Sequence, residues 1–266
     1  MFLEIIKAVA LGAIEGLTEF LPISSTGHLI LANEWLSFSE SFTKMFDIVI
    51  QLGAILAVVV YFWPKLWPFN KDAAAKQKII SIWKKTILGV IPAIILGGLL
   101  GSWLEAHLFN PWVVGAVLII GGVIIILVEK KHIAPKYNSI AEIPLTTIIG
   151  IGLIQCLAMI PGTSRSGATI IGALLLGVSR AVAVEFSFFL AIPTMVAATG
   201  YSLIKHSSTI SSSELITLAV GFVVAFLVAL LVIKFFLNLI KRHNLLAFGY
   251  YRLVLGALIF IYFLIK

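Results

Sequence analysis

The sequence contains few charged residues and a single cysteine. Of the 266 residues, 12% are charged and 61% are hydrophobic, and the mean hydropathy is +1.11. Because soluble domains carry about 25% charged residues, this composition excludes an ordinary soluble fold. Cys156 has no partner for an intrachain disulfide, and no cysteine–histidine spacing typical of a metal site occurs. The first residues lack the basic region and cleavage site of a secretory signal, so we expect the first apolar segment to be retained.

Acidic residues are scarce relative to basic ones. The formal net charge is +7 and the isoelectric point is near 9.5. A nucleic-acid partner is not expected, since no basic stripe with interleaved aromatic residues occurs. The lysines and arginines instead lie in short connections between apolar runs, where they set the orientation in a membrane and face anionic headgroups.

Long apolar runs are abundant. Each is close to the length of about 20 residues that a helix needs to cross a bilayer. The six runs cover residues 45–63, 86–104, 112–128, 182–204, 215–240 and 248–265. The predicted fold is therefore all-α and polytopic, an integral membrane protein with one membrane domain over residues 1–266.

The lysine distribution predicts how these runs are oriented. The connection at 63–86 holds six lysines and one aspartate, which places it in the cytoplasm. If the runs cross the membrane in alternating directions, the segment 1–44 begins outside the cytoplasm. It also makes the serine-rich stretch 207–213 an extracytoplasmic loop.

Two further segments must begin and end on the same side of the membrane. Segments 1–36 and 145–179 each contain an apolar helix, a break at Pro22 or Pro161, and a second short helix. This pattern predicts two re-entrant helical hairpins, whose irregular backbone must be buried in protein or line a cavity.

The two hairpin segments also share a sequence pattern at an offset of 140 residues. G-x-I-E-x-L at 12–17 matches G-x-I-Q-x-L at 152–157, and S-x-T-G at 24–27 matches S-x-S-G at 164–167. Each half would hold one hairpin and three spans, and an odd number of spans inverts the second half. We therefore expect inverted repeats at about 1–128 and 145–266 whose hairpin tips meet near the midplane. The alternative is chance similarity between glycine-rich apolar segments.

An acidic pair lies in the first hairpin. Glu15 and Glu19 are four residues apart and share one face of a helix, where like charges repel. The pair is stable if a cation, a shared proton or a positive ligand lies between the carboxylates. Oxygen ligands of this kind suit Mg²⁺ or Ca²⁺, so we predict a divalent metal held by both residues. The alternative is a surface helix with its acids in water.

Hydroxyl groups follow directly. Ser24 and its neighbours are interpreted as the N-cap of a helix over 26–36, and a helix N-terminus is a ready anion site. We expect Ser24, Thr26 and Gly27 to bind substrate. Capping explains one serine, whereas Ser25 and His28 suggest a nucleophile with a general base, and a glutamate is the alternative base. A solvated histidine is the alternative.

The second hairpin carries an arginine at the matching break. Arg165 has a planar fork of donors suited to phosphate. Ser164, Ser166, Gly167 and Thr169 open the following helix and are expected to bind the same anion. The alternative is a structural arginine paired with one of the two glutamates, which would also bring the tips together. A phosphate or pyrophosphate is the expected ligand.

These motifs resemble those of a known family. The stretches are E-G-L-T-E-F-L-P-x-S-S-T-G-H at 15–28, P-G-x-S-R-S-G-A-T at 161–169, F-x-x-V-I-Q-L-G at 46–53 and E-F-S-F at 185–188. They are similar to the undecaprenyl-pyrophosphate phosphatases, the bacterial bacitracin-resistance phosphatases, over nearly the whole chain. Asp47 stands where that family is expected to have glutamate, and it keeps the charge.

The resemblance implies an enzyme of the bacterial inner membrane, and the predicted topology makes its active site open toward the extracytoplasmic side. It would remove the terminal phosphate of undecaprenyl pyrophosphate, recycling the carrier for cell-wall polymers, and would need a divalent cation. It implies Ser25 as nucleophile, with Glu15, Glu19 and His28 around it and Arg165 as the phosphate clamp. Direct attack by a metal-activated water remains open.

Other functions and partners are compatible with parts of the sequence. Inverted repeats with broken helices are typical of transporters, so a polyprenyl-phosphate flippase, or a phosphatase that also flips its lipid, is the main alternative. An intramembrane serine protease would leave the glutamates and the arginine without a role. Glycine-rich stretches at 97–101 and 121–122 permit close packing, including that of a homodimer. Asp47 and Gln51 are interpreted as supporting or interfacial residues.

Overall fold

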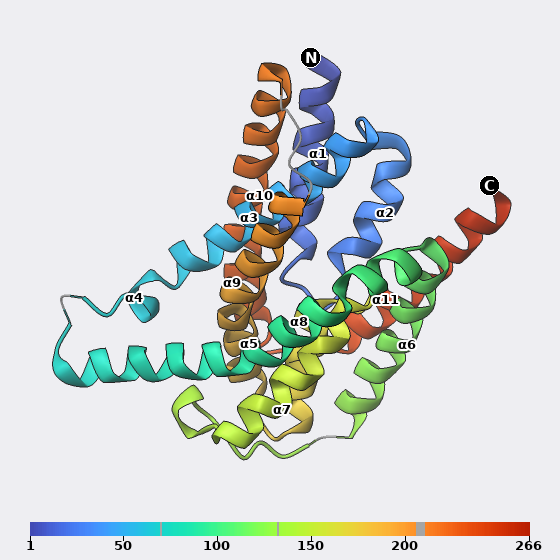
Figure 1. Ribbon diagram of the computed structural model, residues 1–266. Coiled ribbons are helices and arrows are strands. Elements are labelled where there is room, and N and C mark those ends of the chain that lie inside the picture. Colours follow the sequence, from blue (N-terminus) through green and yellow to red (C-terminus); the bar gives the residue numbers. More distant parts are fainter. Residues whose placement is uncertain (70, 132, 206–210) are drawn as a thin grey trace.

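The computed structural model describes residues 1–69, 71–131, 133–205 and 211–266. In this part of the chain the regular elements are all helical (Figure 1). They are α1 (Phe2–Thr18), α2 (Ser25–Leu36), α3 (Glu40–Tyr61), α4 (Trp63–Leu66), α5 (Ala73–Leu108), α6 (Pro111–Lys130), η1 (Ile140–Glu142), α7 (Leu145–Gln155), η2 (Cys156–Met159), α8 (Arg165–Leu175), α9 (Arg180–Lys205), α10 (Ser212–Leu239) and α11 (Leu246–Ile265).

Six of these helices are long and apolar enough to cross a membrane, namely α3, α5, α6, α9, α10 and α11. Each predicted run falls in one of them, so the all-α, multi-pass prediction is confirmed. The predicted loop at 207–213 lies partly outside the described residues, and Ser211 caps α10, which begins at the next residue.

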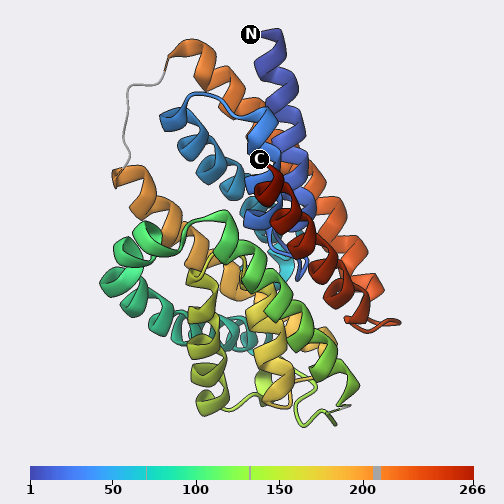
Figure 2. The same ribbon diagram turned by 90° about the vertical axis from the view of Figure 1, so that its right-hand side faces the viewer.

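The remaining apolar helices form two hairpins. Helix α1 packs against α2, and α7 packs against α8. Figures 1 and 2 show the connecting segments of both hairpins turned toward the middle of the molecule. Around them, α1 and α3 pack on α10, while α7 and α9 pack on α5. The two hairpins therefore have comparable neighbours.

Both hairpins approach a long helix closely through glycine. A Cβ atom on Gly12 would lie 2.5 Å from the carbonyl oxygen of Gly221 in α10. A Cβ atom on Gly152 would lie 2.3 Å from the carbonyl oxygen of Gly89 in α5. Any larger residue at either position would push the backbones apart. Gly12 and Gly152 are themselves equivalent positions of the sequence repeat.

The helices of the hairpins end before the prolines that were predicted to break them. Helix α1 ends at Thr18, whose carbonyl would need an N–H from Pro22, which has none. Helix α7 ends at Gln155 and continues as the 3₁₀-helix η2, followed by Pro161. A proline therefore ends the α-helix about one turn before its own position, and a non-helical loop follows.

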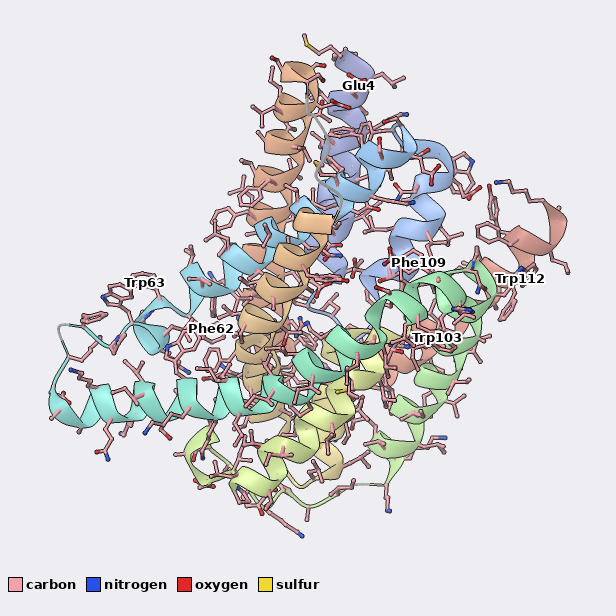
Figure 3. The ribbon with its side chains drawn as sticks, in the orientation of Figure 1. Glu4, Phe62, Trp63, Trp103, Phe109 and Trp112 are labelled. Carbon is pink, nitrogen blue, oxygen red and sulfur yellow. The ribbon has the colours of Figure 1, made fainter. Side chains whose placement is uncertain are left out.

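Large apolar side chains cover the outside of the long helices, as expected for a surface in lipid. Figure 3 shows Trp103, Phe109 and Trp112 around the turn from α5 to α6, with Trp63 on the opposite side of the view. The expectation that glycines permit close packing is confirmed at 121–122. The glycines at 121–122 contact α11 of the same chain, so they are not free for a second copy, whereas Gly98 and Gly101 have open space beside them.

Candidate active site

Two short loops form the centre of the site. The first loop is residues 19–24, between α1 and α2, and the second loop is residues 160–164, between η2 and α8. Each ends in a serine with a positive φ, 70° at Ser24 and 67° at Ser164, and no other described non-glycine residue has one. Such backbone conformations are unfavourable and cluster at functional sites.

The two serines also cap their helices in the same way. The Ser24 hydroxyl accepts a hydrogen bond from the Gly27 N–H at 3.3 Å. The Ser164 hydroxyl accepts one from the Gly167 N–H at 3.1 Å. The N-cap interpretation of both breaks is confirmed, and the predicted glycines serve as capping partners.

Packing and hydrogen bonds hold the first loop against the rest of the molecule. Phe20 is fully buried and meets the ring of Phe188 edge to face, with 5.2 Å between ring centroids. The Ser166 hydroxyl donates to the carbonyl of Leu21 at 2.8 Å, so the start of α8 is tied directly to the first loop. The predicted meeting of the two tips is present in the structure.

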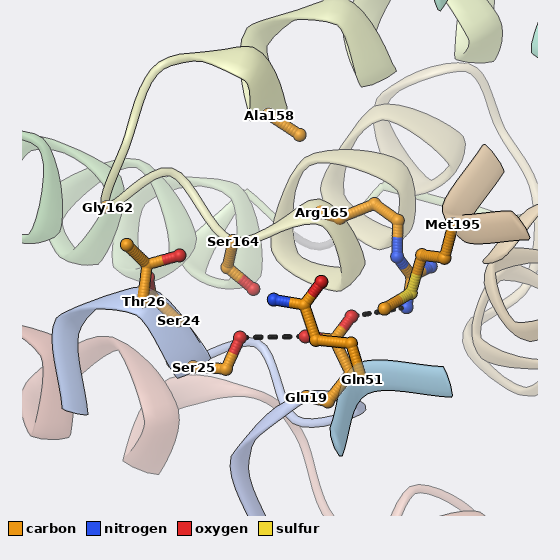
Figure 4. A pocket seen from close by; sticks show the side chains of 10 residues that line it. All are labelled: Glu19, Ser24, Ser25, Thr26, Gln51, Ala158, Gly162, Ser164, Arg165 and Met195. Atoms are coloured by element: carbon orange, nitrogen blue, oxygen red, sulfur yellow. Dashed lines mark hydrogen bonds and ion pairs between the residues drawn. The ribbon is translucent and has the colours of Figure 1, made fainter. Parts of the chain in front are cut away.

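A cavity of about 170 Å³ lies between the loops (Figure 4). Residues of both loops and of α2, α3, η2, α8 and α9 line it. They are Glu19, Ser24, Ser25, Thr26, Gln51, Ala158, Gly162, Ser164, Arg165 and Met195. Six of the residues predicted to form the site therefore face one space.

Glu19 links the two halves of this cavity. Its Oε2 accepts a hydrogen bond from the Ser25 hydroxyl at 2.7 Å. Its Oε1 lies 3.2 Å from Nη2 of Arg165, and the two side chains are only 8% and 9% exposed. A carboxylate that accepts from a hydroxyl in this way is placed to take its proton. Figure 4 shows the resulting chain of Ser25, Glu19 and Arg165.

One nitrogen of the Arg165 guanidinium has no hydrogen-bond partner. Its Nη1 donates to the carbonyl of Ser187 at 3.0 Å, and its Nε is buried without a hydrogen-bond partner. The Thr169 hydroxyl pairs with that of Ser187 at 2.6 Å and also donates to the Arg165 carbonyl. A buried N–H without a partner is costly, so an acceptor such as a phosphate oxygen fits this position.

Glu15, four residues before Glu19, is fully buried. Neither of its carboxylate oxygens has a hydrogen-bond partner. A buried carboxylate without donors is strongly unfavourable unless a cation or a proton accompanies it. The donor chemistry of Glu15 thus fits a hard divalent cation.

Glu15 and Glu19 are the two carboxylates predicted to hold such a cation. Within the described ranges no group of three or more His, Cys, Asp or Glu side chains is placed to hold a metal. Mg²⁺ commonly binds through one or two carboxylates together with waters and substrate phosphates. Of the two predicted metals, Mg²⁺ agrees better with this sparse set.

His28 is directed away from the Ser25 hydroxyl. Its Nδ1 lies 2.7 Å from the carbonyl of Ser24, and its Nε2 lies 2.7 Å from the hydroxyl of Tyr251. Because a carbonyl only accepts, Nδ1 carries the hydrogen, and in the neutral ring Nε2 accepts from the tyrosine. The expected pairing of His28 with Ser25 is not seen, and Glu19 occupies that place.

Some predicted residues support the site from outside the cavity. The hydroxyls of Ser166 and Thr169 bind protein atoms, and neither residue lines the space. Sequence reasoning assigned Gln51 a supporting role, yet it lines the cavity from α3. The sequence feature that could have identified Gln51 as a site residue is its position one helical turn after Asp47. Asp47 itself accepts a hydrogen bond from Asn33 at 2.8 Å.

Comparisons with known proteins agree with this site. The chain matches the family described as "Bacitracin resistance protein BacA" over residues 8–258. It is 50% identical to an undecaprenyl-diphosphatase of Enterococcus faecalis, covering 97% of this chain and 96% of the relative. It is 50% identical to one of Lactiplantibacillus plantarum, covering 98% of each protein, and 44% identical to one of Rhodopseudomonas palustris, covering 97% of each. The chain therefore belongs to the BacA family of bacitracin-resistance proteins.

Proposed function

We propose that the cavity between the two loops is where this chain hydrolyses undecaprenyl pyrophosphate to undecaprenyl phosphate and inorganic phosphate. The reaction returns the lipid carrier to cell-wall synthesis. The observation that carries this assignment is the chain of Ser25, Glu19 and Arg165 at the cavity wall, with contacts of 2.7 and 3.2 Å. This arrangement supports roles for Ser25 as nucleophile, Glu19 as its base and Arg165 as the anion-binding group, because all three side chains line one cavity.

The terminal phosphate binds between the two helix N-termini. The unpaired Nε of Arg165 supplies one hydrogen-bond donor, and the first-turn N–H groups of α2 and α8 that the capping serines do not take supply others. Since these donors are fixed by the loops, they stabilise charge on the phosphoryl oxygens without reorganising. The prenyl tail remains in the lipid.

Ser25 then attacks the terminal phosphorus. Its proton passes to Glu19, the bond to the bridging oxygen breaks, and undecaprenyl phosphate leaves with the electron pair. In a second step a water molecule attacks the phosphoserine. Ser25 Oγ leaves and takes back the proton from Glu19, while both protons of the attacking water leave on the released phosphate, which then gives one of them to solvent.

Glu15 and Glu19 would hold the divalent cation that the reaction requires. When bound, the cation supplies charge neutralisation at the phosphate oxygens and a more acidic water. Glu15 is the better ligand of the two, because both of its oxygens lack a partner whereas those of Glu19 are engaged. Glu19 thereby remains available as a base.

The chemical test uses purified protein and undecaprenyl pyrophosphate labelled in its terminal phosphate. We expect release of phosphate and a labelled phosphoserine at Ser25 during the burst phase. In Ser25→Ala both signals disappear. Residual turnover of this variant without a covalent species would replace the serine route by direct attack of water.

The inverted-repeat and re-entrant arrangement is also part of this proposal. It is supported by the equal backbone geometry at Ser24 and Ser164 and by the matched glycine crossings of α1 and α7. In this arrangement the first hairpin enters from the extracytoplasmic side, and the product forms near that face. A cysteine at position 40, in a Cys156→Ala background, should react with an impermeant maleimide in intact cells. Labelling only after the cells are opened would reverse the orientation.

A lipid transporter is the competing function. Two loops that meet inside a membrane protein are typical of transporters, and such a protein needs the anion site without a nucleophile. In sealed vesicles a transporter moves undecaprenyl phosphate between leaflets without releasing phosphate. Movement without hydrolysis would favour it, and both activities together would indicate a dual role.

A further inference from the structure

A second arginine lies under both loops. Arg252, in the middle of α11, is 1% exposed. Sequence reasoning did not single it out, because it stands in an apolar run far from either motif. Among the described residues no carboxylate pairs with it.

The guanidinium of Arg252 binds backbone carbonyls with all of its N–H groups. Two of its acceptors belong to the second loop, Gly162 at 3.0 Å and Thr163 at 2.8 Å. A third, Pro22 at 3.4 Å, belongs to the first loop. The remaining two are the carbonyls of Leu118 and Val117 in α6, both at 3.3 Å. One side chain therefore joins both loops to the α6–α11 pair.

The rest of the molecule leaves room for this group. A Cβ atom on Gly121 of α6 would lie 2.3 Å from Nη2 of Arg252. A Cβ atom on Gly167, in the first turn of α8, would lie 3.3 Å from its Nη1. The guanidinium is thus enclosed between α6 and the start of α8, and its position is fixed by packing as well as by hydrogen bonds.

These contacts also orient the peptide groups of the site. In a trans peptide the C=O and N–H point in opposite directions. The bond from Arg252 to the Thr163 carbonyl therefore directs the N–H of Ser164 away from Arg252, and Ser164 lines the cavity. An error of about 1 Å in the placement of reacting groups can cost about 100-fold in rate.

We infer that Arg252 is a positioning residue: by joining the carbonyls of the two loops it sets the distance between the Ser25–Glu19 pair and Arg165. This inference rests on the proposed function for its kinetic effect. Its structural effect, a fixed separation of the two hairpins, can be measured without activity.

The kinetic test compares three variants. Arg252→Met introduces an unbranched apolar side chain and removes all hydrogen-bond donors. We expect kcat per folded molecule to fall about 100-fold, with a smaller change in KM. Arg252→Lys keeps the charge but has only three donors, so its kcat should lie between those of wild type and Arg252→Met. Gly121→Ala displaces the guanidinium without removing it and should lower kcat by about tenfold or more.

A matched control and an independent readout separate positioning from general stability. Gly115→Ala, also on α6 and facing α11, would meet the Phe260 ring at 3.1 Å and should leave kcat within about twofold. Spin labels at Trp35→Cys and Leu175→Cys, both exposed, report the α2–α8 distance in a Cys156→Ala background. We expect a broadened distance distribution in Arg252→Met and Gly121→Ala, and not in Gly115→Ala.

Each outcome decides the inference. Unchanged distances together with kcat near wild type in folded Arg252→Met or Gly121→Ala would overturn it. A smaller amount of folded protein with an unchanged kcat per folded molecule would also overturn it, because the residue would then be structural only. If Arg252→Met does not fold, Gly121→Ala decides alone. A wild-type protein that releases no phosphate would contradict the proposed function, while the distance measurement would still test Arg252.

Discussion

Replacing Glu19 by glutamine tests the central contact of the site. The carboxylate accepts from Ser25 with one oxygen and from Arg165 with the other. An amide of the same shape has one oxygen and one NH₂ group, so it can accept from only one of these partners. If the oxygen stays with Arg165, the NH₂ group faces the hydroxyl and cannot take its proton. If it turns to Ser25, two donors oppose each other at Arg165.

The expected loss follows from the role of the carboxylate. A positioned general base contributes about 10²–10⁴ in rate, which corresponds to about 2.7–5.5 kcal/mol in the barrier. We therefore expect kcat of Glu19→Gln to fall by at least about 100-fold. The Arg165 charge also loses its partner, and breaking a buried pair costs about 3–5 kcal/mol. A lower melting temperature should accompany the loss of rate.

The assay measures phosphate release from undecaprenyl pyrophosphate in detergent, with kcat and KM determined separately. Glu40→Gln is the matched control, because Glu40 is 88% exposed and pairs only with Lys44 at the surface. It should behave like wild type. If Glu19→Gln retained kcat within about threefold, Glu19 would not be the base, and the reasoning from its two contacts would be refuted.

Three further variants or conditions probe the fold, the metal and the histidine. Gly12→Ala should cost about 1–3 kcal/mol through contact with α10, seen as a lower melting temperature, whereas Gly98→Ala, with open space, should not. Chelation should abolish activity and Mg²⁺ restore it; Glu15→Gln should raise the half-maximal Mg²⁺ concentration about tenfold or more. Tyr251→Phe removes one hydrogen bond to His28, worth about 1 kcal/mol. A loss of kcat as large as that of the glutamine variant would make His28 the base.

The sequence predicted the elements and the two motifs that meet. Composition and run length identified six spanning helices, and each is found. The 140-residue offset placed Ser24 and Ser164 in equivalent positions, and both have a positive φ. These predictions succeeded because hydropathy and helix capping are local properties that can be read along the chain.

Contacts between distant segments could not be read in this way. Motif reasoning left two candidate bases for Ser25, His28 and a glutamate. In the structure Ser25 donates to Glu19, while a ring nitrogen of His28 meets Tyr251 from more than 200 residues away. Gln51 looked like a supporting residue, although packing of α3 brings it to the cavity wall.

By itself the sequence determined a multi-pass helical protein with an acidic, hydroxyl-rich loop and an arginine-bearing loop, because each follows from residue types and short spacings. Only the tertiary structure decided which atoms meet. It paired Ser25 with Glu19, left Nε of Arg165 unpaired, and placed Arg252 under both loops. The physical reason is that several of these contacts, such as Arg165 to Glu19 and Arg252 to Pro22, join segments more than 100 residues apart, and packing across the whole bundle fixes their geometry.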